Sequence, residues 1–309
     1  MKKVLFATTA LIATGGMAAA DVTLSGSGRF GIVYNDSAAL TSSTKIEKRM
    51  TINIDGSGST DGGLEFGGRI RLRSDENEAG SGQSSANVFM GNDMFRITVG
   101  NTDGALLNRV GYYQGSVGLT GLQWANVSFN IGTNTFYLNS FSSRGGGAAD
   151  VVRLDFNAGG FGVSLSTDST GDHTSGISED AIAVSYNFGD WTAAAGIAKD
   201  ANGAGQDATS LSIVGSIGDF GVGLGYTDLK TIGNKVTLSG SYSFGDTSVT
   251  AYVASTSEDT AGSAGLAVGQ NDQSYGIGFS HSLGGATLSG GVSSNYGATM
   301  ADLGVSFSF

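Results

Sequence analysis

Apolar and polar side chains alternate with a period of two residues along most of this 309-residue chain. Arg69, Arg71 and Arg73, for example, alternate with Ile70 and Leu72. A helix of 3.6 residues per turn would scatter the three arginines around its circumference, whereas an extended strand places all of them on one face. The pattern therefore predicts an all-β chain. We expect strands near residues 22–35, 45–55, 63–74, 84–91, 94–101, 148–157, 160–168, 179–188, 190–199, 208–218, 219–228, 235–244, 247–256, 272–283, 285–294 and 299–309.

The composition narrows the class of β protein. The chain contains 52 glycines and no proline or cysteine, and 14% of its residues are charged, against roughly 25% in soluble domains. Without cysteine, a disulfide scaffold, a cysteine-ligated metal centre and thiol catalysis are excluded. The absence of proline suits long strands in which every backbone N–H is needed for the ladder. We expect no cofactor and no metal, and the formal charge of −11 argues against nucleic-acid partners.

The first twenty residues have the features of an export signal. Two lysines precede a short apolar stretch, residues 4–13, and residues 18–20 form an A-x-A cleavage site. The apolar stretch is too short for a membrane-spanning helix, which needs about 20 residues. Residues 1–20 are therefore predicted to be a cleaved signal peptide, which leaves residues 21–309 as a single domain outside the cytoplasm.

The connections between the predicted strands differ in length. Tight turns, such as those before Trp191 and Phe220, alternate with long polar segments such as residues 168–179 and 257–271. Short turns at one end and long loops at the other are typical of an outer-membrane barrel. Because lipid cannot hydrogen-bond exposed backbone amides, a sheet inside a membrane must close on itself. We therefore predict a transmembrane antiparallel β-barrel of about 16 strands, exported through the periplasm to a bacterial outer membrane; the alternation also allows a secreted β-rich adhesin.

The alternation is interrupted between Asn101 and Gly147, which is the longest irregular stretch of the chain. A structureless segment of this length in a compact fold is usually functional. The lumen of a barrel of about sixteen strands is too wide for wall side chains to fill, so a loop folded inward would narrow it. The apolar residues between Asn126 and Leu138 allow another interpretation, in which they form a further hairpin. The barrel would then have about eighteen strands, as a substrate-specific channel.

Four segments give the chain a resemblance to a known family. They are the opening Asp21–Asn35, the turn Gly58–Gly67, residues 99–101 before the irregular stretch, and the ending Met300–Phe309. In them the chain resembles the trimeric general porins of Gram-negative bacteria, and specifically their alphaproteobacterial branch. The resemblance implies a sixteen-stranded barrel, a homotrimer, and a third loop folded inward that narrows a channel for passive diffusion of small hydrophilic solutes and ions. It also implies that Phe309 is a signal to the outer-membrane assembly machinery.

The charged side chains expected at the constriction follow from strand parity. Arg or Lys on the lipid side near the midplane would cost about 2–4 kcal/mol, so arginines on the polar faces belong in the lumen. In such porins basic wall residues face acidic loop residues, but here Asp103 is the only acidic residue between Asn101 and Gly147, which puts a strong transverse field in doubt. The predicted wall residues are Arg29, Arg49, Arg69, Arg71, Arg73 and Arg153. The predicted loop residues are Asp103, Arg109, Tyr112 and Tyr113.

Many of the acidic residues fall in the predicted external loops. Carboxylates there could bind divalent cations or bridge lipopolysaccharide of the outer-membrane lipid, although solvated loop charge is the simpler interpretation. We therefore expect only low ion discrimination. The residues of this set are Asp75, Glu76, Glu78, Asp172, Glu179, Glu258, Asp259 and Asp272.

The two histidines, His173 and His281, are the residues available for acid–base chemistry. Neither lies in a G-x-S-x-G elbow or an H-E-x-x-H helix. A barrel hydrolase would need His281 beside a serine and a carboxylate or amide. We therefore expect no enzyme activity and keep hydrolysis as the second function class.

Overall fold

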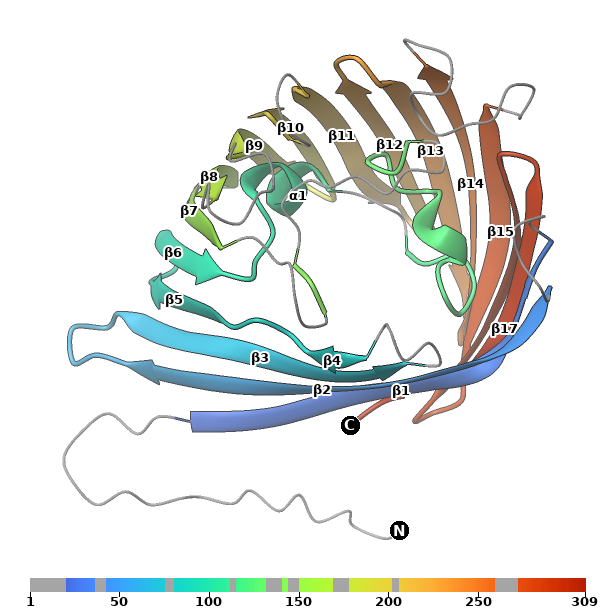
Figure 1. Cartoon of the computed structure of the whole chain (residues 1–309), viewed down its shortest axis with the longest axis horizontal. Coiled ribbons are helices and arrows are strands. Elements are labelled where there is room, and N and C mark those ends of the chain that lie inside the picture. Colours follow the sequence, from blue (N-terminus) through green and yellow to red (C-terminus); the bar gives the residue numbers. More distant parts are fainter. Residues whose placement is uncertain are drawn as a thin grey trace, which may run out of the picture.

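The computed structural model describes residues 21–36, 43–75, 81–111, 115–131, 141–143, 150–168, 178–201, 206–258 and 272–309. Their strands form one antiparallel sheet that closes into a barrel. The closure occurs at β1 (Asp21–Asn35), which pairs with β2 (Thr44–Ser59) on one side and with β17 (Ala298–Ser308) on the other. Figure 1 shows the strands arranged around an open centre.

The remaining strands follow one another around the ring, each paired with its neighbours in the chain. Two short segments, β4 and β5, both pair with β3, opposite residues 72–73 and 65–69 respectively. They are consecutive parts of one interrupted strand, so the seventeen described segments make a sixteen-stranded barrel, as predicted. The segments are β3 (Glu65–Asp75), β4 (Gly82–Gln83), β5 (Asn87–Gly91), β6 (Phe95–Gly100), β7 (Val151–Ala158), β8 (Phe161–Asp168), β9 (Asp180–Phe188), β10 (Trp191–Lys199), β11 (Ala208–Ile217), β12 (Phe220–Leu229), β13 (Gly233–Phe244), β14 (Thr247–Glu258), β15 (Gln273–Ser282) and β16 (Thr287–Asn295).

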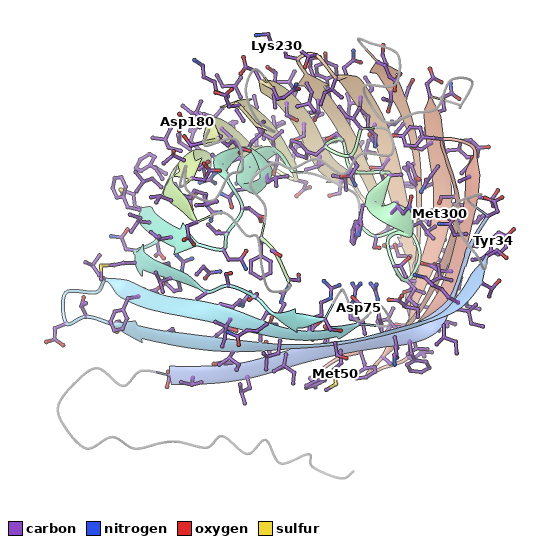
Figure 2. All side chains as sticks on the ribbon, viewed as in Figure 1. Tyr34, Met50, Asp75, Asp180, Lys230 and Met300 are labelled. Carbon is purple, nitrogen blue, oxygen red and sulfur yellow. The ribbon has the colours of Figure 1, made fainter. Side chains whose placement is uncertain are left out.

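The apolar face of the sheet points away from the lumen. Phe30 and Ile32 are 56% and 58% exposed on the outer face of β1. Val33, which points to the inner face of the same strand, is buried. In Figure 2, Met50 of β2 points out of the ring and Asp75 of β3 points into it. Large apolar side chains on an outer surface require a hydrocarbon environment. The predicted direction of the two faces is therefore confirmed.

The connections at the two ends of the barrel differ, largely as predicted. Tight turns with glycine at positive φ lie at one end, for example at Gly189, Gly218 and Gly245. Aromatic pairs lie on the outside of the same end, and their ring centroids are 4.2 to 4.9 Å apart, as in the interfacial girdle of a membrane barrel. At the opposite end, two connections, residues 230–232 and 296–297, are also short, which departs from the strict alternation expected. The aromatic pairs are Phe95–Phe156, Phe161–Tyr186 and Phe220–Tyr242.

The described part of the irregular stretch, residues 101–111, 115–131 and 141–143, folds into the barrel. Its two helical turns, α1 (Ala105–Val110) and η2 (Leu122–Trp124), lie within the ring in Figure 1. α1 contacts β8, β9 and β10, and η2 contacts β16 and β17. Leu106 and Phe129 are buried against alanines of β9 to β11, while Leu122 is buried with Tyr252 and Met300. Burial of apolar side chains thus holds the loop on two patches of the inner wall. In the described residues, no helix is long and apolar enough to cross a membrane.

Two expectations from the sequence are wrong. The segment from Asn126 adds no hairpin to the wall, because β6 pairs directly with β7, and the N–H groups of Val127 and Asn130 form turns by bonding to carbonyls three residues earlier. Residues 132–138 of the expected hairpin lie outside the described residues, and the closed ladder makes the eighteen-strand alternative wrong. Asp75 is not in an external loop, because the ladder continues one residue beyond the predicted strand and pairs Asp75 with Arg49. Among the other acidic residues of that set, Glu179 is buried and Glu258 and Asp272 lie at strand ends. Residues 1–20, Glu76, Glu78, Asp172, His173 and Asp259 lie outside the described residues.

Candidate pore constriction

Four of the predicted arginines lie together on the inner wall formed by β1, β2 and β3. The antiparallel register places Arg29 opposite Arg49, and Arg73 opposite Thr51 on the next ladder. Arg71 follows on the same face, opposite Asn53. Because residues opposite each other on a ladder share one face of the sheet, the register alone gathers these side chains into one patch, which we call the arginine row (Arg29, Arg49, Arg71 and Arg73).

Wall carboxylates neutralise part of the arginine row. Arg29 Nε lies 2.6 Å from Glu47 Oε1. Arg49 and Arg73 share one oxygen, Oδ2 of Asp75, with the nearest nitrogens at 2.8 and 3.2 Å. All three arginine side chains are only partly buried, so these pairs remain open to water and to solutes. Four guanidinium groups therefore face two carboxylates.

Arg71 links the wall to the loop. Its Nε donates to Asn53 Oδ1 and its Nη1 to Ser143 Oγ, both at 2.8 Å. The guanidinium carbon also lies 4.7 Å from the ring centroid of Phe141, within the range of a cation–π contact. These partners are neutral, so they hold the guanidinium of Arg71 in position without neutralising its positive charge.

The arginine row and the loop line one cavity of about 780 Å³. On the loop side its walls are Ser116, Leu119, Trp124 and Ser143. None of these side chains carries a charge, so the described face opposite the arginine row is neutral. The opposition of acidic loop and basic wall is therefore absent from this part of the lumen.

Two predicted wall arginines lie outside this cavity. Arg69 pairs with Asp55 at 2.6 Å, and both side chains are well exposed. Arg153 bonds Asp155 at 2.9 Å and also reaches the loop, donating to the Thr102 hydroxyl and to the carbonyl of Asp103. Arg153 therefore holds the beginning of the loop to β7.

The described loop residues of the predicted set, Arg109 and Asp103, form hydrogen bonds with other residues of the wall and the loop. Arg109 donates to Ser164 Oγ at 2.7 Å and to the carbonyls of Phe156 and Val163. Its burial lowers the pKa of the guanidinium, with nearby Asp155 opposing the shift. Asp103 accepts the N–H of Phe141 through Oδ1. Tyr112 and Tyr113 lie outside the described residues.

Three wall residues that were not predicted hold the second half of the loop. The ammonium of Lys235 is fully buried and donates to the carbonyls of Ala125, Val127 and Asn130 at 2.7, 3.0 and 2.5 Å. Asn295 Nδ2 donates to the carbonyl of Leu122 at 2.9 Å. The third, Asp302, accepts backbone N–H groups of the loop. Strand parity could have placed these residues in the lumen, but their loop partners lie more than one hundred positions away in the chain.

Arg96 is a further luminal arginine that the predicted set lacked. It lies opposite Asp155 on the ladder between β6 and β7. Its guanidinium carbon is 3.7 Å from the ring centroid of Phe89, which favours a stable stacked position over the aromatic ring. The sequence did contain a signal for this position, because Arg96 lies on the polar face of the expected strand 94–101.

His281 does not form part of a luminal site. It lies opposite Thr247 on the outer face of β15, and its Nδ1 is 2.8 Å from the Thr247 hydroxyl. A triad needs a base positioned by a carboxylate or amide, whereas the hydrogen-bond partner of this imidazole is the hydroxyl of a threonine. The described residues also contain no group of three or more potential metal-ligating His, Cys, Asp or Glu side chains.

An apolar exterior, a closed sheet, charged groups in the lumen and a loop folded inward together define a porin-type channel of the outer membrane. A sequence model of the Gram-negative porin family matches residues 7–298. Porins of Fuscovulum blasticum and Rhodobacter capsulatus are 31% and 28% identical to this chain, and each alignment covers 94% of the chain and 100% of the relative. A solved structure of a Rh. blastica porin mutant superposes with a TM-score of 0.79 at 28% identity, over 94% of this chain and 100% of the other.

The chain therefore belongs to the Gram-negative porin family. It is a general porin of the outer membrane, homologous to alphaproteobacterial porins, and forms a channel for passive diffusion. The channel is not an enzyme, so the expectation of no catalytic activity is confirmed, and the hydrolase and adhesin alternatives are excluded.

Proposed function

We propose that solutes pass this porin through a constriction between the arginine row and the loop residues Ser116, Leu119, Trp124 and Ser143. The observation that carries the proposal is that both sides line the same cavity of about 780 Å³. Arg29 Nη1 lies 3.4 Å from the carbonyl of Leu119, so wall and loop approach each other here. Arg69 and Arg153 lie outside the cavity and pair with Asp55 and Asp155, while Arg109 holds the loop to the wall.

The charge balance of this constriction favours a weak preference for anions. Four guanidinium groups face two carboxylates, Glu47 and Asp75, and the described loop side is neutral. Fixed positive charge lining a narrow aqueous path raises the local concentration of anions. Because partial neutralisation and salt screening oppose this effect, ion discrimination is expected to stay low.

Reversal potentials in asymmetric KCl test the proposal. Replacing Arg49 and Arg73 together by glutamine should lower the chloride-to-potassium permeability ratio, because two of the four positive charges that line the cavity are removed. Arg69→Gln is the matched control, since Arg69 is paired with Asp55 outside the cavity. An unchanged ratio in the double variant of a conducting, folded protein would place the constriction elsewhere.

We further propose that the porin is a homotrimer. Lys48 supports this proposal, because it is exposed on the outer face of β2, opposite Phe30. A lysine on the lipid-facing surface is costly to a degree that depends on its depth in the membrane, whereas a neighbouring subunit can cover it. An amine reagent should therefore label Lys48 far more slowly than exposed Lys230 in the native protein and equally after boiling in detergent. A protein with the mass of one chain in mild detergent would contradict the proposal.

We propose that residues 1–20 are removed during export and that Phe309 presents the assembly signal. The two lysines, the short apolar stretch and the A-x-A site of residues 18–20 support the cleavage, and the exposed ring of Phe309 supports recognition by the outer-membrane assembly machinery. In the membrane, lipid and lipopolysaccharide would contact the apolar exterior and the loop end. N-terminal sequencing of the porin from outer membranes should begin at Asp21; a sequence that begins before residue 18 would overturn the assignment.

A further inference from the structure

We propose that the outer face of the barrel binds a phospholipid whose headgroup ends in a primary amine, with an acyl chain in a trough over β10 and the amine on Asp190 and Asp219. The proposal concerns the lipid-facing surface and does not depend on the constriction. The trough is a depression of about 670 Å³ on strands β8 to β12. This volume lies within the range of about 300–1,000 Å³ that holds small ligands.

The trough results from a difference in side-chain size across three strands. Its floor consists of Ala193 and Ala195 on the outer face of β10. The antiparallel register places each alanine between two larger residues, one on β9 and one on β11. Neighbouring strands are about 4.8 Å apart, so the two walls stand about 10 Å apart with only methyl groups between them. The wall residues are Val184 and Tyr186 on β9 and Leu211 and Ile213 on β11.

Larger residues close both ends of the trough. Along the outer face of β10, Trp191 precedes the two alanines and Ile197 follows them. Ile197 is 51% exposed. A β-carbon built at Gly215 of β11 would collide with the indole of Trp191, so this ring lies against the neighbouring strand. The alanines therefore form a bounded depression and not a groove along the whole strand.

The position of the trough favours a lipid chain as its occupant. It lies among exposed apolar side chains of the exterior, such as Leu211 and Leu224. In a membrane such a surface is covered by lipid chains or by another apolar protein. In Figure 1, β9 to β11 lie on the opposite side of the ring from β2, the strand on which Lys48 supports contact with a neighbouring subunit. The trough therefore faces away from that contact and toward the lipid.

Two tight turns place carboxylates beside the trough. Asp190 lies in the turn between β9 and β10, and Asp219 in the turn between β11 and β12; both are exposed. Ala193 follows Asp190 by three residues, which is about 10 Å along an extended strand. The aromatic pair Phe161–Tyr186 marks the membrane interface at this end. The two carboxylates therefore lie at the depth of a lipid headgroup whose acyl chain enters the trough.

The charge of these turns favours an amine headgroup. In the part of the chain that the structure describes, the turns at this end contain no lysine or arginine. Carboxylates repel an anionic headgroup and attract an ammonium group. A primary ammonium also donates hydrogen bonds to the carboxylates, which the quaternary ammonium of choline lacks the N–H groups to do. Phosphatidylethanolamine has this chemistry, and it is the probe of the experiment below.

Quenching of Trp191 fluorescence by brominated acyl chains tests the inference. The chain has two tryptophans, so Trp124→Phe leaves Trp191, beside the floor of the trough, as the reporter. The folded porin is placed in dioleoylphosphatidylcholine vesicles that contain a minor fraction of one brominated lipid. We expect brominated phosphatidylethanolamine to quench about threefold more strongly than brominated phosphatidylcholine, the range of an exposed ion pair, and brominated phosphatidylglycerol to quench least.

Two results of this comparison would overturn the inference. Equal quenching by the three brominated lipids would mean that the trough does not select a headgroup. Absence of quenching by all three would mean that protein, and not lipid, covers this part of the outer face.

A variant of the floor tests the seat of the acyl chain. Ala195→Leu should lower quenching by brominated phosphatidylethanolamine to the level of brominated phosphatidylcholine, because the larger side chain fills the trough. Ala251→Leu is the matched control, since Ala251 is an exposed alanine of β14 and does not line the trough. An undiminished preference in Ala195→Leu would overturn the inference.

A variant of the turns tests the headgroup contact. Asp190→Asn and Asp219→Asn together should remove the preference for phosphatidylethanolamine over phosphatidylcholine and leave the remaining quenching unchanged. Asp61→Asn with Asp93→Asn is the matched control, because these aspartates lie in turns of the same end, between β2 and β3 and between β5 and β6. An equal loss of preference in both pairs would show general attraction to an acidic rim and would overturn the assigned site.

Discussion

Asp302 on β17 accepts two hydrogen bonds from Thr120, one from its backbone N–H and one from its hydroxyl, both at 2.7 Å to Oδ2. The second carboxylate oxygen accepts the N–H of Leu119 at 2.9 Å. Gly118 precedes these residues with a φ of +76°, and a β-carbon there would collide with the carboxylate. One wall residue thus fixes two successive loop residues and lies close against the glycine that precedes them.

Asp302→Ala should loosen the loop in the lumen. The substitution leaves buried N–H groups without their acceptor, and each unsatisfied group costs about 1–3 kcal/mol. We expect larger fluctuations of the open-channel current in single-channel recordings. Asp302→Asn, which keeps a carbonyl acceptor, should be intermediate. A noise level equal to that of the wild type in Asp302→Ala would mean that the other contacts hold the loop without Asp302.

Lys235→Met should weaken the attachment of the loop segment 125–130. It leaves three carbonyls without the ammonium that they share, and hydrogen bonds to a charged group contribute about 1.5–3 kcal/mol each. We expect proteolytic cleavage within the loop to be markedly faster. Lys230→Met is the control, because Lys230 is 65% exposed and 3.6 Å from Asp207, and such surface pairs contribute about 0–1 kcal/mol. Equal cleavage rates in the two variants would argue against an anchoring role for Lys235.

Gly121→Ala should displace the indole of Trp124. The added β-carbon would lie 2.6 Å from the ring at a residue with a φ of +82°, so both the ring and the backbone must move. With Trp191 replaced by phenylalanine, the fluorescence maximum reports Trp124 alone and should shift. Gly189→Ala in the same background is the control, since Gly189 also has a positive φ but nothing lies within 4 Å. If the maximum shifted equally in both variants, the contact between Gly121 and Trp124 would not be its cause.

Phe309→Ala should separate folding from assembly. The backbone of Phe309 bonds Gly26 in both directions, at 2.8 and 3.0 Å, and these bonds do not need the side chain. We expect the purified variant to refold in detergent as judged by heat-modifiable migration, while its level in the outer membrane falls severalfold. Phe307→Ala removes the ring over Gly28 and serves as the comparison. A normal level of Phe309→Ala in outer membranes would exclude the terminal ring as the assembly signal.

The fold could be predicted because its signals are local. The alternation in β1, with Phe30 and Ile32 on one side and Arg29 on the other, needs only the geometry of an extended chain. The strand count was harder at β4 and β5, where one strand is interrupted. Asp75 was misplaced because the end of a strand depends on its partner, and its partner is Arg49.

The site could be predicted only in part. The parity of Arg49 and Arg73 places them in the lumen, but the sequence does not indicate that they share the carboxylate of Asp75. Arg109 was expected at the constriction as a residue of the loop, but its side chain bonds Ser164 of the wall. Strand parity could place the anchoring residue Lys235 in the lumen, but the sequence does not indicate its partners in the loop, which are 105 to 110 positions away.

The sequence by itself determined that this chain forms strands with one apolar and one polar face, because a period of two is a property of each strand alone. It also determined that arginines point inward, since lipid excludes them from the other face. Only the tertiary structure decided which arginines meet, because this depends on the register between neighbouring strands. It likewise decided where the inward loop attaches, because that position results from contacts between residues far apart in the chain.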